Sequence, residues 1–139
     1  MAVSQSARLI EPVGGVARPL VITNKEIERF EDLHPNTGVF ELWDQLSRQG
    51  RRAPLVGHVR DMVTLAMIGG GMNDLAADAL MASLGPEHNE QLRALAFRAL
   101  GVALFPDALV RDVKKNDQES PSERSEPVIY RGDTTSGPE

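Results

Sequence analysis

The three histidines, His34, His58 and His88, are the residues of this 139-residue chain best suited to acid–base or metal chemistry. They are far apart in the sequence, and each falls in a different predicted element. No two of them have the spacing of metal ligands on one element, and the chain has no cysteine that could complete a zinc site. We therefore interpret them as surface or helix-capping histidines and predict no bound metal ion.

Three acidic residues, Glu28, Glu31 and Asp32, lie close together on one predicted helix and resemble part of a carboxylate metal site. Such sites also need a Glu-x-x-His sequence from partner helices, and no partner helix supplies one. We interpret the three as a solvated helix face. The serines lie mainly near the termini, without the pattern of a nucleophile elbow. The sequence thus predicts no catalytic residue and no cofactor, and hence a protein that is not an enzyme.

The glycines Gly69, Gly70 and Gly71 do not form a phosphate-binding loop, because no Lys-Ser or Lys-Thr follows and the next helix starts with an acidic residue. Two helices joined at this glycine turn have the outline of a helix-turn-helix. The second of them, DLAADALMASL, contains two Asp and no Lys or Arg. It would repel phosphates and offers no side chain for guanine edges, so we predict no nucleic-acid binding.

Two further motifs have simple interpretations. Arg48, Arg51 and Arg52 form the basic cluster of the chain, which either meets an acidic partner or solubilises a loop; we favour the loop. Arg131-Gly132-Asp133 matches the integrin-ligand tripeptide, and its place in a polar tail favours chance. No residue is assigned to partner binding from the sequence.

The stretch Val59–Leu84 predicts a helical hairpin at the centre of the core. Apolar residues recur at helical spacing on both sides of the glycines, which end the first helix and let the chain reverse. Asn73 is a suitable N-cap for the second helix, and Asp74 suits its dipole. The predicted inner faces comprise Val59, Met62, Val63, Ala66, Ala76, Leu80 and Leu84.

Two helices are predicted before this hairpin. Thr23-Asn24-Lys25-Glu26 is a capping box, with Ile22 and Ile27 as a hydrophobic staple, and Pro35 ends the helix. We expect Thr37 to cap a second helix to about Gln49. Its predicted buried stripe is Val39, Phe40, Trp43 and Leu46. Whether Ile27 with Phe30 and Phe40 with Trp43 are core or an exposed groove stays open.

The remaining elements are a third helix with Pro54 in its first turn, leading into the hairpin, and a last helix over about Glu87–Leu104. In the last helix, Leu92, Leu95, Ala96, Ala99 and Val102 share one face, while Phe97, Leu100 and Leu104 widen the apolar surface. Near the N-terminus, Arg8–Glu11 and Val16–Ile22 predict a β-hairpin whose second strand Pro19 interrupts.

Together these elements predict one mainly α-helical domain: a short β-hairpin followed by a compact bundle of about five helices. Residues 8–110 form this domain, residues 1–7 a flexible N-terminus and residues 111–139 a disordered polar tail. The net charge of −5 argues against binding to nucleic acid or to an anionic membrane. No apolar run reaches the length of a membrane span. We expect a soluble, intracellular protein.

The order of these elements resembles a known family. A β-ribbon leads into PLVITNKEIERFEDL; VFELWDQL precedes a basic link; DMVTLAMIGGGM ends at small residues; and, after a helix with an acidic start, LRALAFRALGVALF comes last. Over residues 20–106 this is similar to the small tail assembly chaperones of long-tailed phages and prophages, in particular those of gene transfer agents. The long polar tail is a departure from that pattern.

The resemblance implies a non-enzymatic chaperone in the cytoplasm of a bacterial host. Its partners would be the tape measure protein, which it keeps soluble, and tail tube subunits, which polymerise around that protein; a second copy of the chain is a further candidate partner. The alternative is a structural tail component retained in the particle, although tube subunits need a larger β-sheet than one ribbon. A third, less favoured alternative is a small regulatory protein that binds DNA or a partner.

Overall fold

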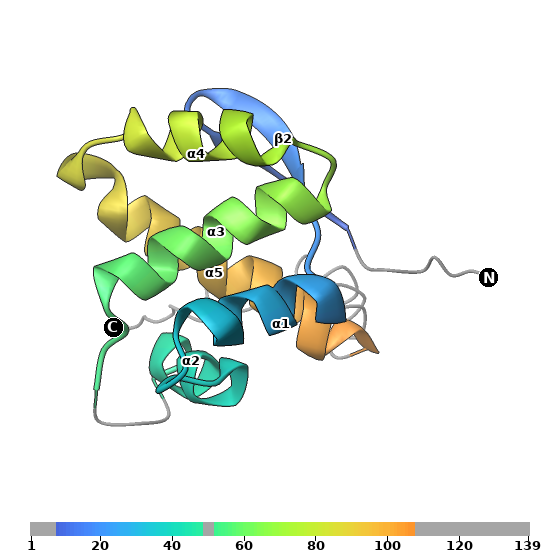
Figure 1. Cartoon of the computed structure of the whole chain (residues 1–139), viewed down its shortest axis with the longest axis vertical. Coiled ribbons are helices and arrows are strands. Elements are labelled where there is room, and N and C mark those ends of the chain that lie inside the picture. Colours follow the sequence, from blue (N-terminus) through green and yellow to red (C-terminus); the bar gives the residue numbers. More distant parts are fainter. Residues whose placement is uncertain (1–7, 49–51, 108–139) are drawn as a thin grey trace, which may run out of the picture. The chain divides into compact units, whose positions relative to one another are not determined.

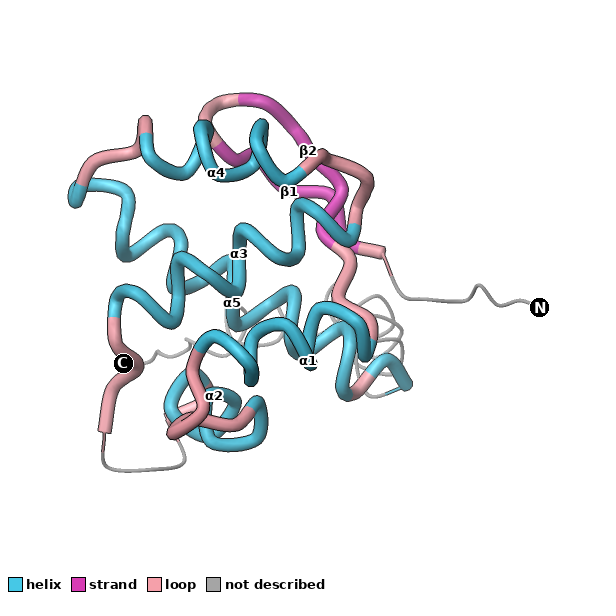
Figure 2. The backbone as a smooth tube through the Cα atoms, viewed as in Figure 1, coloured by secondary structure: helices cyan, strands magenta, loops and turns pink. Residues whose placement is uncertain are grey.

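The computed structural model describes residues 8–48 and 52–107. Within these residues the chain forms an antiparallel hairpin and five α-helices, so the predicted mainly α-helical fold is confirmed (Figures 1 and 2). The predictions for the N-terminus, the polar tail and its Arg-Gly-Asp tripeptide lie outside the described residues. The elements are β1 (Leu9–Val13), β2 (Val16–Leu20), α1 (Asn24–Leu33), α2 (Val39–Leu46), α3 (Val56–Gly69), α4 (Asp74–Ala82), a 3-10 turn (Pro86–His88) and α5 (Asn89–Leu104).

Helix α3 is the centre of the core. It packs against α1, α4, α5 and β2, and seven of its residues are buried. Figure 1 shows α3 passing between α4 and α1. All four residues predicted for its inner face are buried, because a helix covered on several sides must be apolar over most of its circumference. The core is built mainly from Leu, Val, Ala and Met, with Phe30 as its one fully buried aromatic residue among the described residues.

The N-terminal hairpin closes through a two-residue loop, Gly14-Gly15, in which both residues have positive φ. This backbone matches the twist of a tight hairpin and strongly favours glycine. The prediction that Pro19 interrupts the second strand was wrong, since Pro19 pairs with Ile10 inside β2. A two-stranded sheet consists of edge strands only, where a missing N–H group is tolerated.

The capping box at the start of α1 is confirmed. Glu26 Oε1 accepts hydrogen bonds from Thr23 N at 2.7 Å and from Thr23 Oγ1 at 2.6 Å, and the Thr23 side chain accepts from the first turn. Ile22 is buried and Ile27 packs against the same core cluster. Local sequence therefore determines where α1 begins.

Helix α2 differs from its prediction in both its cap and its buried face. Its N-cap is Gly38, not Thr37, and Glu31 of α1 accepts a hydrogen bond from the first amide, Val39 N, at 2.9 Å. The described helix ends at Leu46. Phe40 is exposed rather than buried, and Leu42, which the prediction omitted, is fully buried. A partner from another helix thus replaces the local cap, while Val39 and Leu46 of the predicted stripe are buried as expected.

The glycine turn after α3 is confirmed, and each of its glycines has a separate cause. A Cβ atom on Gly69 would overlap with the carbonyl oxygen of Val21, and one on Gly70 with that of Pro19. Gly71 has φ of +119°. Val21 N also donates to Ala66 O at 3.0 Å, so the segment after β2 lies directly against the end of α3.

Helix α4 begins as predicted, with Asn73 Oδ1 accepting from Ala76 N at 2.8 Å. Its predicted face is confirmed in part: Leu84 is buried and Leu80 packs against the core, whereas Ala76 is exposed, and Ala77 and Met81 are buried in addition. The C-terminal end of α4 is tied to α3 by Arg60, whose Nη2 donates to the carbonyls of Met81 and Leu84 at 2.6 Å each. A cation at this end also complements the helix dipole.

Helix α5 buries the whole predicted face and also Leu100. It packs on α3 and α2, and Arg98 joins it to the hairpin through two hydrogen bonds with Glu11, of 2.9 and 3.1 Å. Pro54 does not lie in α3, which begins two residues later at Val56, and Glu87 lies in the 3-10 turn that precedes α5. Among the described residues, no helix is both long and apolar enough to cross a membrane.

Candidate functional site

Three of the six aromatic residues of the chain, Trp43, Phe97 and Phe105, pack together where α2 meets α5, and with the nearby Phe40 they form a group that we call the aromatic surface. Trp43 of α2 stacks on Phe97 of α5, with ring centroids 5.1 Å apart and planes 6° from parallel. It also meets Phe105 at 5.3 Å. Phe40 lies one turn before Trp43 on α2. The exposed fractions are 73% for Phe40, 40% for Phe97 and 47% for Phe105.

Gly101 explains how the Trp43 ring reaches this position. It lies four residues after Phe97 and four before Phe105, on the same stripe of α5. A Cβ atom at Gly101 would lie only 3.3 Å from Trp43 Cη2. The indole thus packs on nearly bare helix backbone between the two phenylalanines. Because each ring remains partly open to solvent, the aromatic surface is available for contact with another molecule.

A groove of about 290 Å³ extends the aromatic surface towards the start of α5. We call it the α2–α5 groove. Its charged residues are Arg48, Arg93 and Glu90, so one excess positive charge lines it, in a chain with a net charge of −5. Glu90 lies 3.8 Å from Arg93 and is largely exposed, which makes this a weak surface pair. The lining residues are Leu46, Ser47, Arg48, Glu90, Arg93, Ala94 and Phe97.

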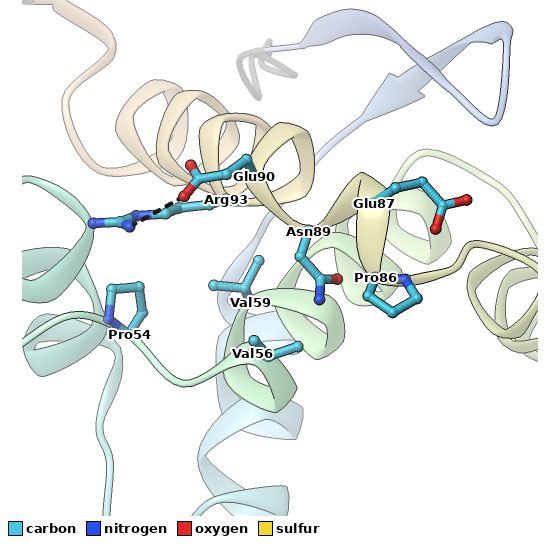
Figure 3. A pocket seen from close by; sticks show the side chains of 8 residues that line it. All are labelled: Pro54, Val56, Val59, Pro86, Glu87, Asn89, Glu90 and Arg93. Atoms are coloured by element: carbon cyan, nitrogen blue, oxygen red, sulfur yellow. Dashed lines mark ion pairs between the residues drawn. The ribbon is translucent and has the colours of Figure 1, made fainter.

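A second hollow, of about 200 Å³, shares Glu90 and Arg93 with this groove. Figure 3 shows its apolar wall at Val56 and Val59 and the Arg93 side chain extending past Pro54. Small-molecule sites usually enclose roughly 300–1,000 Å³, and both hollows are smaller. Their size and open apolar lining suit side chains of another protein better than a small ligand. The lining residues are Pro54, Val56, Val59, Pro86, Glu87, Asn89, Glu90 and Arg93.

The sequence suggested that the three histidines lie apart, but two of them are in contact in the fold. His34, at the end of α1, and His58, in the first turn of α3, have ring centroids 4.3 Å apart, and Phe30 packs against both. His34 Nε2 lies 2.7 Å from Asp61 Oδ2 and is the donor, since a carboxylate only accepts. In the described part of the chain, no three acidic or histidine side chains are placed to hold a metal ion.

His58 is the polar group of this cluster that lacks a partner. Its Nδ1 is buried without a hydrogen bond among the described residues. Burial lowers the pKa of His58 below its usual 6.5, and repulsion from His34 lowers this pKa further, against the opposing effects of Asp61 and Glu41. The cluster therefore joins α1 to α3 in surroundings that disfavour the charged form of His58. No sequence spacing indicated it, because α1 and α3 meet only in the folded domain.

The other residues considered from the sequence remain dispersed. Glu28, Glu31 and Asp32 are exposed, as expected for a solvated face, and Glu31 has the additional role of capping α2. His88 lies near Glu87, at 3.6 Å. Arg48 and Arg52 are exposed, and Arg51 lies outside the described residues. The signal that the sequence analysis missed was the spacing of Phe97, Gly101 and Phe105, which marks a second stripe on α5.

No protein-family model, curated protein or solved structure matches this chain.

Proposed function

We propose that the protein is a tail assembly chaperone of a phage, prophage or gene transfer agent, acting without catalysis in the cytoplasm of the bacterial host. Its partner is the tape measure protein, a long and partly apolar rod, which it covers until tail tube subunits replace it. The proposal takes its partner from the resemblance in element order.

The observation that carries the proposal is the aromatic surface. A domain with only 4% aromatic residues leaves Phe40, Phe97 and Phe105 exposed at 40% or more, although such side chains would stabilise a core if buried. Amphipathic helices are commonly bound by apolar grooves between helices. An open surface on a small domain also suits a contact that must later dissociate.

The alternative of a retained structural subunit has less support. Tube subunits close into rings through sizeable β-sheets. The described residues contain one sheet, and it has two strands. A regulatory protein that binds DNA would need a basic face, and α4 instead presents Asp74 and Asp78 to solvent.

Co-expression with the long tape-measure-like protein encoded beside this chain tests the proposal. We expect the two to co-elute in size-exclusion chromatography, the long protein to stay soluble, and this chain to be absent from finished particles. Phe40→Ala should weaken the complex, whereas Leu75→Ala should not. Leu75, which is 83% exposed, provides the control on α4, which Figure 1 draws at the end opposite to α2. Finding this chain in purified particles without such a complex would favour the structural alternative.

A further inference from the structure

We infer that the aromatic surface and the α2–α5 groove bind one amphipathic helix of the partner, whose apolar stripe lies on the aromatic rings and whose carboxylates lie at Arg48 and Arg93. This inference rests on the proposed function for the identity of the partner. It adds that the bound segment is an amphipathic helix and that the end of this helix beside the two arginines is negatively charged.

The aromatic surface and the α2–α5 groove form one continuous strip along α5. Phe97 belongs to both, since it stacks on Trp43 and also lines the groove. From Glu90 to Phe105 the strip covers 16 residues along α5, or about 22 Å at the rise of an α-helix. A partner helix of about four turns matches that length.

The charge of the strip is unequal along its length. At one end are Trp43 and Phe105, and at the other are the guanidinium groups of Arg48 and Arg93. The opposing Glu90 contacts Arg93 only at 3.8 Å, and in the described residues Arg48 has no carboxylate within ion-pair distance. A bound helix with carboxylates at the arginine end gains favourable contacts there, and one with ammonium groups at that end is repelled.

Trp43 is the single tryptophan of the chain, so its fluorescence reports directly on this strip. The probes are three synthetic 16-residue peptides without Trp or Tyr. One is a Leu/Ala amphipathic helix with Glu at one end, the second has Lys in place of Glu, and the third has the composition of the first in scrambled order. They are titrated into the full-length protein.

We expect saturable changes in Trp43 emission with the Glu peptide and binding weaker by about tenfold with the Lys peptide. The scrambled peptide should not bind. Arg93→Glu should reverse the preference between the two helical peptides. Arg8→Glu makes the same change of charge at an exposed residue before β1 and should leave the preference unaltered.

Equal binding of the Glu and Lys peptides, or no binding of either, would overturn the inference. So would a stable dimer in sedimentation that Phe40→Ala dissociates, because a second copy would then occupy the surface. The peptide titration does not involve the long partner protein. Peptide binding without capture of the tape-measure-like protein would therefore refute the proposed function separately, and capture without peptide selectivity would refute the inference alone.

Discussion

His58 takes part in a contact with His34 that the sequence around either histidine does not predict. It is separated from His34 by a whole helix and a loop, and only the crossing of α1 and α3 brings the rings together. Local sequence correctly indicated that His34 lies at a helix end. It could not indicate the pair, because that depends on tertiary packing.

The lowered pKa of His58 predicts a pH-dependent stability. A histidine whose folded-state pKa is below its unfolded value favours the folded protein above about pH 6.5, and this stability is lost as the pH falls below that value. One such proton changes the free energy of unfolding by at most about 1.4 kcal/mol per pH unit. Urea denaturation at pH 7.5 and 5.5 should therefore show a smaller difference for His58→Gln than for the wild type.

His88→Gln is the control, because His88 lies outside this cluster. Its pH dependence should match that of the wild type. Asp61, Glu41 and His34, the titratable groups that face His58, are present in the wild type and in both variants. If His58→Gln keeps the full wild-type difference, His58 is not the group responsible.

At the level of elements, predictions succeeded where the determining contacts are local. The capping box of α1 and the Asn73 cap of α4 involve residues three apart, so their sequence pattern suffices. The cap of α2 could not be predicted from Thr37, because Glu31 provides it from a neighbouring helix. The face of α4 could be predicted only in part, since short apolar segments such as DLAADALMA fit more than one helix face.

The glycine turn gives the sharpest prediction at this level. Gly69→Ala should destabilise the domain by about 1–3 kcal/mol, because the new methyl group would overlap with the Val21 carbonyl oxygen and displace backbone. Alanine's higher helix propensity, about 1 kcal/mol, is too small to compensate for a displaced chain. Thermal or urea unfolding followed by circular dichroism measures the change.

Gly57→Ala is the matched control, in the first turn of the same helix. A Cβ atom there meets no heavy atom within 4 Å, so the propensity gain should appear as stabilisation of up to about 1 kcal/mol. Opposite signs for the two substitutions are expected. A neutral or stabilising Gly69→Ala would mean that the segment after β2 does not lie against the end of α3.

For the whole molecule, the sequence left one question open that only the fold answers: which apolar pairs form the core. Phe30 is fully buried, Ile27 and Trp43 are partly buried and pack against the core cluster, and Phe40 is exposed. Both pairs have helical spacing, and periodicity alone cannot distinguish a face that meets α3 from one that meets solvent. Phe30 therefore stabilises the core, whereas Phe40 is free to bind another molecule.

That separation predicts different outcomes for the same substitution at two phenylalanines. Phe30→Ala removes a fully buried ring and should lower the free energy of unfolding by about 3–5 kcal/mol. Phe40→Ala removes a ring that is 73% exposed and should change this free energy by no more than about 0.5 kcal/mol. Phe40→Ala should nevertheless weaken capture of the long partner protein, and this loss should occur without a loss of stability. Urea denaturation and co-elution, measured on the same preparations, distinguish the two effects. If Phe40→Ala unfolds the domain as readily as Phe30→Ala, the aromatic surface is part of the core and the proposed binding surface is wrong.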